Sequence, residues 1–178
     1  QVFKDVKGQY SCSGTPVDCV KIAIYEILKR KPDIIVSGIN HGSNVSTNVL
    51  YSGTMSAAIE GALENIPSVG FSLTSFDSNA DFSLSTKVVE KTFDYLLKGK
   101  MGAFTCLNVN IPDIDKKEFK GLKIARQAKT PSSVTKGSRD EASGGLTDPI
   151  LRSSFRCVGA VGPPETSSWE SFTTRGGM

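Results

Sequence analysis

The stretch PDIIVSGINHGSN, residues 32–44, decides the fold class of this chain. Its residues 33–37 form a short, continuous apolar run of the kind found in strands that are covered on both faces. Pro32 ends the helical pattern that precedes this run. The polar residues 38–49, rich in Gly and Asn, then read as a loop. We therefore expect a helix, a buried strand and a loop in this order.

The same order recurs along the chain. Thr15 is a capping hydroxyl and Pro16 occupies the first helical position, so a helix is expected from Pro16 to Lys31. The periodicity predicts further helices at 55–65 and 84–99, and strands at 68–73, 104–111 and 122–126. Strands that alternate with helices of ten or more residues pair in parallel through right-handed crossovers. The prediction is an α/β sandwich with helices on both faces of a mostly parallel sheet.

The composition supports a single globular domain in a reducing compartment. The chain has 178 residues and a net charge of +3 in mixed sign, which is too weak to indicate a nucleic-acid duplex. Its four cysteines form no Cys-x-x-Cys pair, and no apolar run approaches the roughly 20 residues of a membrane helix. We expect a cytoplasmic protein that does not enter the membrane.

Two regions differ in character. Residues 1–127 carry the α/β pattern, whereas residues 128–178 are dense in Ser, Thr, Gly and Pro and show no sustained period. We predict a core in the first region and an atypical, poorly ordered tail in the second. Either a shift of reading frame near Ala128 or a divergent tail would explain the change.

Candidate site residues follow the first buried strand. Asn40 and Asn44 offer neutral carbonyl oxygens that suit a hard cation such as Mg²⁺ or Mn²⁺. Ser52, Gly53 and Thr54 stand at the start of the next helix, where hydroxyls and unpaired N–H groups favour a phosphate. Ligands of open α/β sheets bind beyond the carboxyl ends of the strands, so this joint position predicts a site for a metal and a phosphate.

Each feature also has a structural interpretation. Ser and Thr are common helix caps, and Asn-rich loops often form ordinary turns. His41 is the only histidine, and a solvated loop residue is a simpler interpretation than a proton donor. The asparagines between Asn108 and Pro112 are expected to orient loops rather than to bind a ligand. The absence of a Gly-x-Gly-x-x-Gly turn disfavours a dinucleotide-dependent oxidoreductase.

Four motifs in this order resemble the SurE family, the survival-protein nucleotidases. They are SGTPVDCVKIAI, PDIIVSGINHGSN, YSGTMSAAIEGAL and LNVNIP, and the resemblance covers residues 11–127. It implies a Rossmann-like fold and a phosphatase that depends on a divalent metal and releases phosphate from 5′- and 3′-nucleoside monophosphates. It also implies a homodimer or homotetramer.

The resemblance implies roles for individual residues. Asn40 would be the metal-ligating asparagine, and Asn44, Ser52 and Thr54 would be the catalytic residues that line the phosphate site. Gly53 would let the phosphate approach the backbone. Residues 15–18 would form a loop near the nucleotide.

The chain also departs from the family pattern. The family opens with a strand that ends in Asn-Asp-Asp-Gly, whose aspartates ligate the metal, and no Asp-Asp pair occurs in the 178 residues. A dication held by one neutral asparagine should bind weakly. We therefore expect a sandwich that is incomplete at the N-terminus and a poor catalyst. The alternative is a non-catalytic fragment that retains phosphate or nucleotide binding or subunit contacts.

Overall fold

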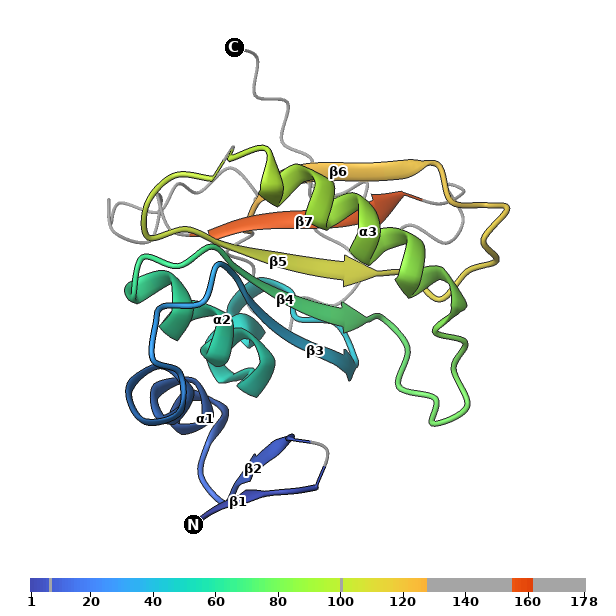
Figure 1. The fold of residues 1–178 in the computed structure, drawn as a ribbon. Coiled ribbons are helices and arrows are strands. Elements are labelled where there is room, and N and C mark those ends of the chain that lie inside the picture. Colours follow the sequence, from blue (N-terminus) through green and yellow to red (C-terminus); the bar gives the residue numbers. More distant parts are fainter. Residues whose placement is uncertain (7, 100, 128–154, 162–178) are drawn as a thin grey trace.

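The computed structural model describes residues 1–6, 8–99, 101–127 and 155–161 (Figure 1). Its elements, in chain order, are β1 (Val2–Lys4), β2 (Tyr10–Cys12), α1 (Pro16–Ile22), the π-helix η1 (Ala23–Ile27), β3 (Ile35–His41), the 3₁₀-helix η2 (Ser46–Tyr51), α2 (Gly53–Leu63), β4 (Ser68–Leu73), α3 (Ser83–Leu97), β5 (Cys106–Ile111), β6 (Gly121–Arg126) and β7 (Phe155–Val161). None of the helices in this part of the chain has the length and apolar character that crossing a membrane requires.

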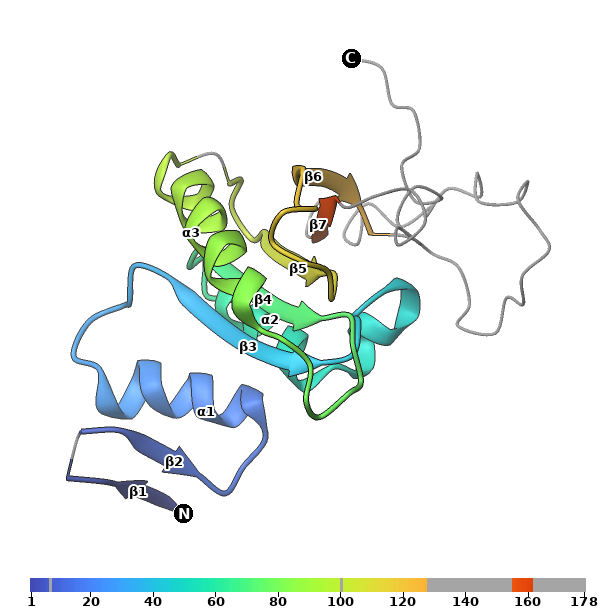
Figure 2. The same cartoon turned by 90° about the vertical axis from the view of Figure 1, so that its right-hand side faces the viewer.

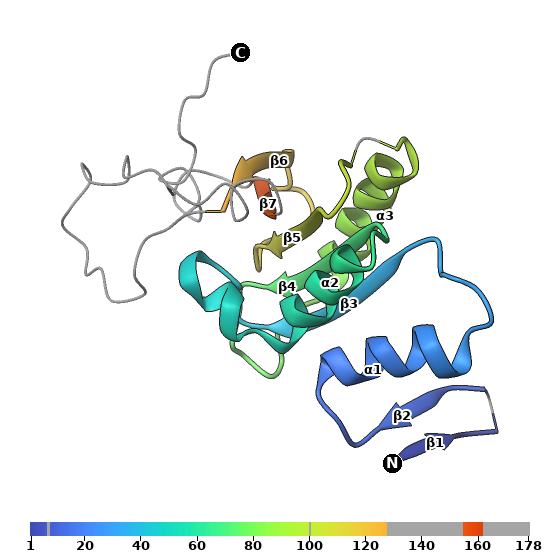
Figure 3. The ribbon, with the colours of Figure 1, turned by 90° about the vertical axis from the view of Figure 1, so that its left-hand side faces the viewer.

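A five-stranded sheet with the order β3-β4-β5-β7-β6 forms the centre of the molecule. The first four strands in this order run parallel, and β6 runs antiparallel to β7. Figures 2 and 3 show α3 on one side of the sheet and α2 on the other, with α1 and the β1–β2 hairpin beyond α2. The predicted α/β fold, a Rossmann-like sandwich of three layers around a mostly parallel sheet, is therefore confirmed.

Side chains that alternate along β4 and β5 divide the interior into two parts. Large apolar side chains of both strands pack with α3 in the main core: Val69, Phe71, Leu73, Leu107, Val109 and Ile111, with Leu84, Val88 and Leu96 from the helix. Small or polar residues point to the opposite face: Ser68, Gly70, Ser72, Cys106, Asn108 and Asn110. All of these positions are buried. Both strands are therefore covered on both faces, although only the face toward α3 carries large apolar side chains. We call the opposite face, under α2 and η2, the α2 face.

A β-bulge in β3 decides which of its residues reach the α2 face. Ser37 pairs with Gly70 and Asn40 pairs with Ser72, so three steps along β3 match two along β4. The extra residue reverses the alternation and turns Asn40 to the α2 face, whereas Ile39 packs against the main core. Gly38 makes this possible: its φ is +108°, and a Cβ there would lie 2.3 Å from the carbonyl oxygen of Phe71.

Several boundaries differ from those predicted. β3 extends to His41, whereas the sequence predicts a loop from residue 38, because after the bulge Asn40 and His41 still pair with β4. The first helix ends early: Leu28 donates its amide to the carbonyl of Ala23, five residues back, which widens its last turn. The β1–β2 hairpin was not predicted.

The strand β7 is a further correction. The sequence predicts no element in residues 128–178, yet residues 155–161 pair with β5 on one side and β6 on the other. The segment has no clear alternation, and its pairing depends on long-range contacts that a local pattern does not encode. The rest of that stretch, with the predicted tail and the reading-frame hypothesis, lies outside the described residues.

Gly61 provides a test of how closely α2 approaches the sheet. A Cβ there would lie 2.3 Å from Ser68 Oγ and 3.1 Å from Ile35 Cβ. We predict that Gly61→Ala lowers the free energy of unfolding by about 2 kcal/mol through overpacking. This cost exceeds the gain in helix propensity of about 1 kcal/mol. Chemical denaturation measures the change. Leu63→Ala, at an exposed position of the same helix, is the control and should change stability by less than about 0.5 kcal/mol. A stabilised Gly61→Ala variant would contradict the packing described here.

Candidate functional site

Three polar residues form a row across the carboxyl ends of neighbouring strands. Asn40 of β3 pairs in register with Ser72 of β4, which pairs with Asn110 of β5. Register partners in a sheet share a face, so all three lie on the α2 face. In open α/β sheets this edge is where ligands bind. The row therefore places amide and hydroxyl groups at the expected position for a site.

The side chain of Asn44 joins this row from the loop after β3. Its Nδ2 donates to Ser72 Oγ at 2.6 Å and to Asn40 Oδ1 at 3.2 Å. Ser72 Oγ in turn donates to Asn40 Oδ1 at 2.8 Å, and Asn40 Nδ2 donates to the carbonyls of His41 and Gly42. The amide of Asn40 is thus engaged at both ends. Asn44 Oδ1 accepts no hydrogen bond from the described residues and is the unengaged oxygen of the group.

Two buried asparagines of β5 hold the main chain of Asn44. Its amide donates to Asn110 Oδ1 at 2.8 Å, and its carbonyl accepts from Asn108 Nδ2 at 2.6 Å and from Asn110 Nδ2 at 3.4 Å. Asn110 Nδ2 also donates to Asn108 Oδ1 at 3.1 Å. Both side chains are fully buried, where unpaired amides would be costly. The asparagines expected to orient loops do so here. We call Asn40, Asn44, Ser72, Asn108 and Asn110 the asparagine cluster.

Gln127 extends this cluster to the loop at Ser46. It accepts from Asn108 Nδ2 at 3.0 Å and donates from Nε2 to the carbonyl of Ser46 at 2.9 Å. Ser46 has a φ of +53°, a conformation uncommon for residues other than glycine. Its hydroxyl is buried and has no hydrogen-bond partner among the described residues. The loop is thus held in a conformation that it would not prefer alone. No local motif points to Gln127 or Ser46, because their contact joins distant parts of the chain.

The N-terminus of α2 lies on the same face as the asparagine cluster. Ser52 is its N-cap and accepts a hydrogen bond from the amide of Met55 at 3.1 Å. A Cβ at Gly70, two residues before Ser72, would lie 3.4 Å from Thr54 Cγ2. The first turn of α2 therefore packs over β4 beside the cluster. The predicted phosphate residues and the predicted asparagines share one face of the sheet, as the site hypothesis requires.

The first residue of α1, Pro16, reaches the same helix end. A Cβ at Gly53 would lie 3.1 Å from Pro16 Cγ. Thr15 and Asp18 form a capping box, with Thr15 N and Oγ1 donating to Asp18 Oδ2 at 2.7 and 2.8 Å. Both bonds lower the pKa of Asp18, and the bond from the Thr15 backbone has the larger effect. Pro16 thus lies beside Gly53, and Asp18 serves in the cap of α1; the expected position of residues 15–18 near a nucleotide stays a prediction.

His41 lies apart from the asparagine cluster. It follows Asn40 in β3 and therefore points to the opposite face. Its ring contacts Phe82 edge-to-face, with ring centroids 5.0 Å apart, and Phe82 packs against the main core. Asp33, which stands just before β3, pairs with Arg30, whose hydrogen bonds lower the pKa of Asp33. Neither residue is placed to assist chemistry at Asn44.

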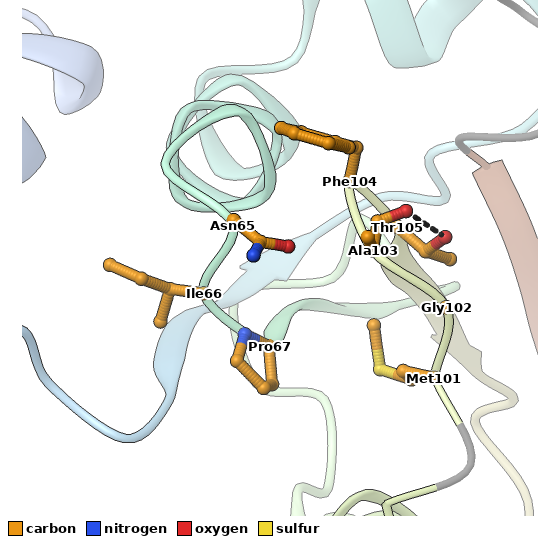
Figure 4. A pocket seen from close by; sticks show the side chains of 8 residues that line it. All are labelled: Asn65, Ile66, Pro67, Met101, Gly102, Ala103, Phe104 and Thr105. Carbon is orange, nitrogen blue, oxygen red and sulfur yellow. Dashed lines mark hydrogen bonds between the residues drawn. The ribbon is translucent and has the colours of Figure 1, made fainter.

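A pocket of about 190 Å³ opens at the other end of the sheet. Its lining comes from residues 65–67, just before β4, and residues 101–105, just before β5 (Figure 4). Asn65 and Thr105 are the polar side chains of this lining, and Thr105 Oγ1 donates to the carbonyl of Ala103. The pocket therefore lies at the amino ends of strands whose carboxyl ends carry the candidate site.

The donor set of the site is neutral. The asparagine cluster contains amides and one hydroxyl, and within the described ranges no group of three or more His, Cys, Asp or Glu side chains could hold a metal ion. Amide oxygens are acceptable ligands for a hard cation, but they lack the charge that dominates its affinity. The described residues thus provide part of a cation site and do not complete one.

This fold and site define a Rossmann-like α/β protein with a polar ligand site at the carboxyl edge of its sheet. A comparison with family models matches residues 1–133 to "Survival protein SurE". The chain therefore belongs to the SurE family, and the resemblance seen in its four motifs is confirmed.

Individual relatives agree with this assignment. The chain is 59% identical over 125 residues to the 5′-nucleotidase SurE of Flavobacterium johnsoniae, an overlap of 70% of this chain and 48% of that protein. It is 57% identical over 120 residues to the 5′-nucleotidase SurE of Christiangramia forsetii, covering 67% and 46%. The crystal structure of the SurE protein from Aquifex aeolicus superposes with a TM-score of 0.67 and 29% identity, covering 91% of this chain and 73% of that one. The chain thus spans about half the length of the two bacterial 5′-nucleotidases.

Asn110 is the residue that tests the asparagine cluster. Asn110→Leu preserves most of the side-chain volume but leaves the amide of Asn44 without its acceptor in a buried site. We predict a loss of about 3 kcal/mol in the free energy of unfolding, since an unsatisfied buried group costs about 1 to 3 kcal/mol and more than one is affected. The amide of Asn44 should also lose its protection from hydrogen exchange.

The control is Thr92→Val, which removes a buried hydroxyl that donates only to the carbonyl of Val88 within α3. It should cost about 1 kcal/mol and leave the exchange of the Asn44 amide unchanged. Equal exchange of that amide in the wild type and in Asn110→Leu would show that Asn110 does not hold the loop.

Proposed function

We propose that this chain carries the phosphate-binding side of a phosphomonoesterase that hydrolyses 5′- and 3′-nucleoside monophosphates with the help of a divalent cation, Mg²⁺ or Mn²⁺. The names of its relatives, 5′-nucleotidase SurE, support the reaction class. One structural observation carries the proposal: the unengaged oxygen of Asn44 and the N-terminus of α2 lie on one face at the carboxyl edge of the sheet.

The start of α2 would bind the phosphate. The first amides of a helix have no acceptor within it, so Gly53 and Thr54 can donate to phosphoryl oxygens. Ser52 Oγ accepts from Met55 N and keeps its own proton to donate. Gly53 has no side chain that would keep the phosphate away from the backbone. These donors would stabilise the charge that develops on the phosphoryl oxygens during the attack of a water in line with the leaving group.

Asparagine side chains would provide the neutral part of a cation site. Asn40 is the ligand predicted from the sequence, but its Oδ1 already accepts two hydrogen bonds. Asn44 Oδ1 is unengaged, so Asn44 is the better placed of the two and Asn40 would act by orienting it. A bound divalent cation polarises a phosphoryl oxygen and lowers the pKa of a bound water. The described residues do not complete such a site.

A second candidate is phosphate or nucleotide binding without turnover. The neutral donor set favours it, because the asparagine cluster contains no carboxylate to attract a dication. Phosphate release from a nucleoside monophosphate, measured with Mn²⁺ and again with excess chelator, separates the two candidates. Turnover that the chelator abolishes supports the enzyme, whereas nucleotide binding with no turnover supports the binding protein.

Ser52 offers the sharpest test of the phosphate site. Asp and Asn both cap helices about as well as Ser, so Ser52→Asp and Ser52→Asn should keep the stability of α2. Only Ser52→Asp adds a negative charge where the phosphate would bind. We predict that inorganic phosphate binding, measured by calorimetry, is lost in Ser52→Asp and weakens only a few-fold in Ser52→Asn. Wild-type affinity in Ser52→Asp would exclude this helix end as the phosphate site.

A further inference from the structure

Phe76 is an exposed aromatic side chain beside the candidate site. It lies in the loop after β4 and is 83% exposed. One part of its ring rests on the main chain of Gly42: a Cβ at Gly42 would lie 2.3 Å from Phe76 Cε1 and 2.6 Å from Cζ. The remainder of the ring is open to solvent. A large apolar surface is thus presented to water next to a polar site.

The loop that carries Phe76 is fixed on both sides of it. The carbonyl of Ser75 accepts a hydrogen bond from the amide of Gly42 at 2.9 Å, and its hydroxyl accepts one from the amide of Asp77 at 3.3 Å. Thr74 donates its amide to the carbonyl of Ile111 at 2.8 Å. The backbone around Phe76 is therefore held against both the β3 loop and β5. Because this backbone is already ordered, a ligand that stacks on the ring restricts mainly the side chain of Phe76.

Phe76 is connected to the asparagine cluster through Gly42. The carbonyl of Gly42 accepts from Asn40 Nδ2 at 2.9 Å, and Asn44 follows two residues later, which limits the Cα separation to about 7 Å. A ligand whose phosphate lies near Asn44 therefore has the aromatic ring within the reach of a nucleoside. Flat aromatic groups stack on such rings irrespective of their hydrogen-bonding edges.

We propose that Phe76 is the platform on which the nucleobase of the substrate stacks, and that it sets the preference for nucleotides over other phosphate esters. The inference rests on the proposed function and deepens it. It identifies what the site recognises beyond the phosphate: a planar aromatic group, with little discrimination between one base and another.

The test compares two ligands that differ only in the base, adenosine 5′-monophosphate and ribose 5-phosphate. Calorimetry should show that the wild-type chain binds the nucleotide about tenfold more tightly, as expected for one base stacked on one aromatic ring. Phe76→Ala should remove this difference while leaving the affinity for ribose 5-phosphate unchanged. Phe76→Tyr, which keeps the ring, should restore the preference.

Phe104→Ala is the matched control, because Phe104 is also an exposed aromatic residue but lies at the amino ends of the strands (Figure 4). It should bind both ligands as the wild type does. Equal binding of the two ligands by the wild type, or a preference that survives Phe76→Ala and is lost in Tyr51→Ala, would overturn the role of Phe76 while leaving the phosphate site intact. Failure to bind either ligand would overturn the proposed function together with it.

Discussion

The close approach of Gly38 to β4 is the constraint on which the site depends. The strand β3 passes so near the carbonyl of Phe71 that only a glycine fits, and its φ of +108° is one that other residues rarely adopt. The bulge formed there changes the alternation of the strand, so Asn40 joins Ser72 and Asn110 on the α2 face. In a regular strand Asn40 would point to the main core, and the polar row across the three strands would not exist.

The asparagine cluster shows how a neutral polar site can be buried. Amides donate and accept at once, so the side chains of Asn108 and Asn110 can bind the main chain of Asn44 and each other without any charge to desolvate. Nearly every polar atom is used, and the oxygen of Asn44 is left for a ligand. Such a network is rigid because the loss of one member leaves others unsatisfied. The left-handed conformation at Ser46 is maintained by the same set of contacts.

Much of the fold follows from local sequence patterns. The strand at 68–73 and the helices at α2 and α3 are predicted within about two residues, because apolar periodicity and capping residues such as Ser52 act locally. The bulge at Gly38 could not be predicted, since it depends on how closely β3 passes β4. The strand β7 was missed for a similar reason: its partners are distant in the sequence.

The same distinction applies to the site. Asn40, Asn44 and Ser52 could be identified from their position after a strand and before a helix, and the structure brings them to one face. The sequence did not indicate that Asn40 would be engaged by Ser72, because that contact requires the bulge. The link through Gln127 to Ser46 likewise joins residues 81 positions apart. Residue types in a motif predict which chemistry is available, whereas the register of the sheet decides which atoms remain free for it.

The most direct test of the central claim is a titration of the ¹⁵N-labelled chain with inorganic phosphate, followed by the amide resonances of individual residues. If the start of α2 binds the oxyanion beside Asn44, the amides of residues 52–55 and of the neighbouring residues 42–46 should shift together with a single dissociation constant. Shifts confined to other surfaces, such as residues 65–67 and 101–105 at the opposite end of the sheet, would contradict the account.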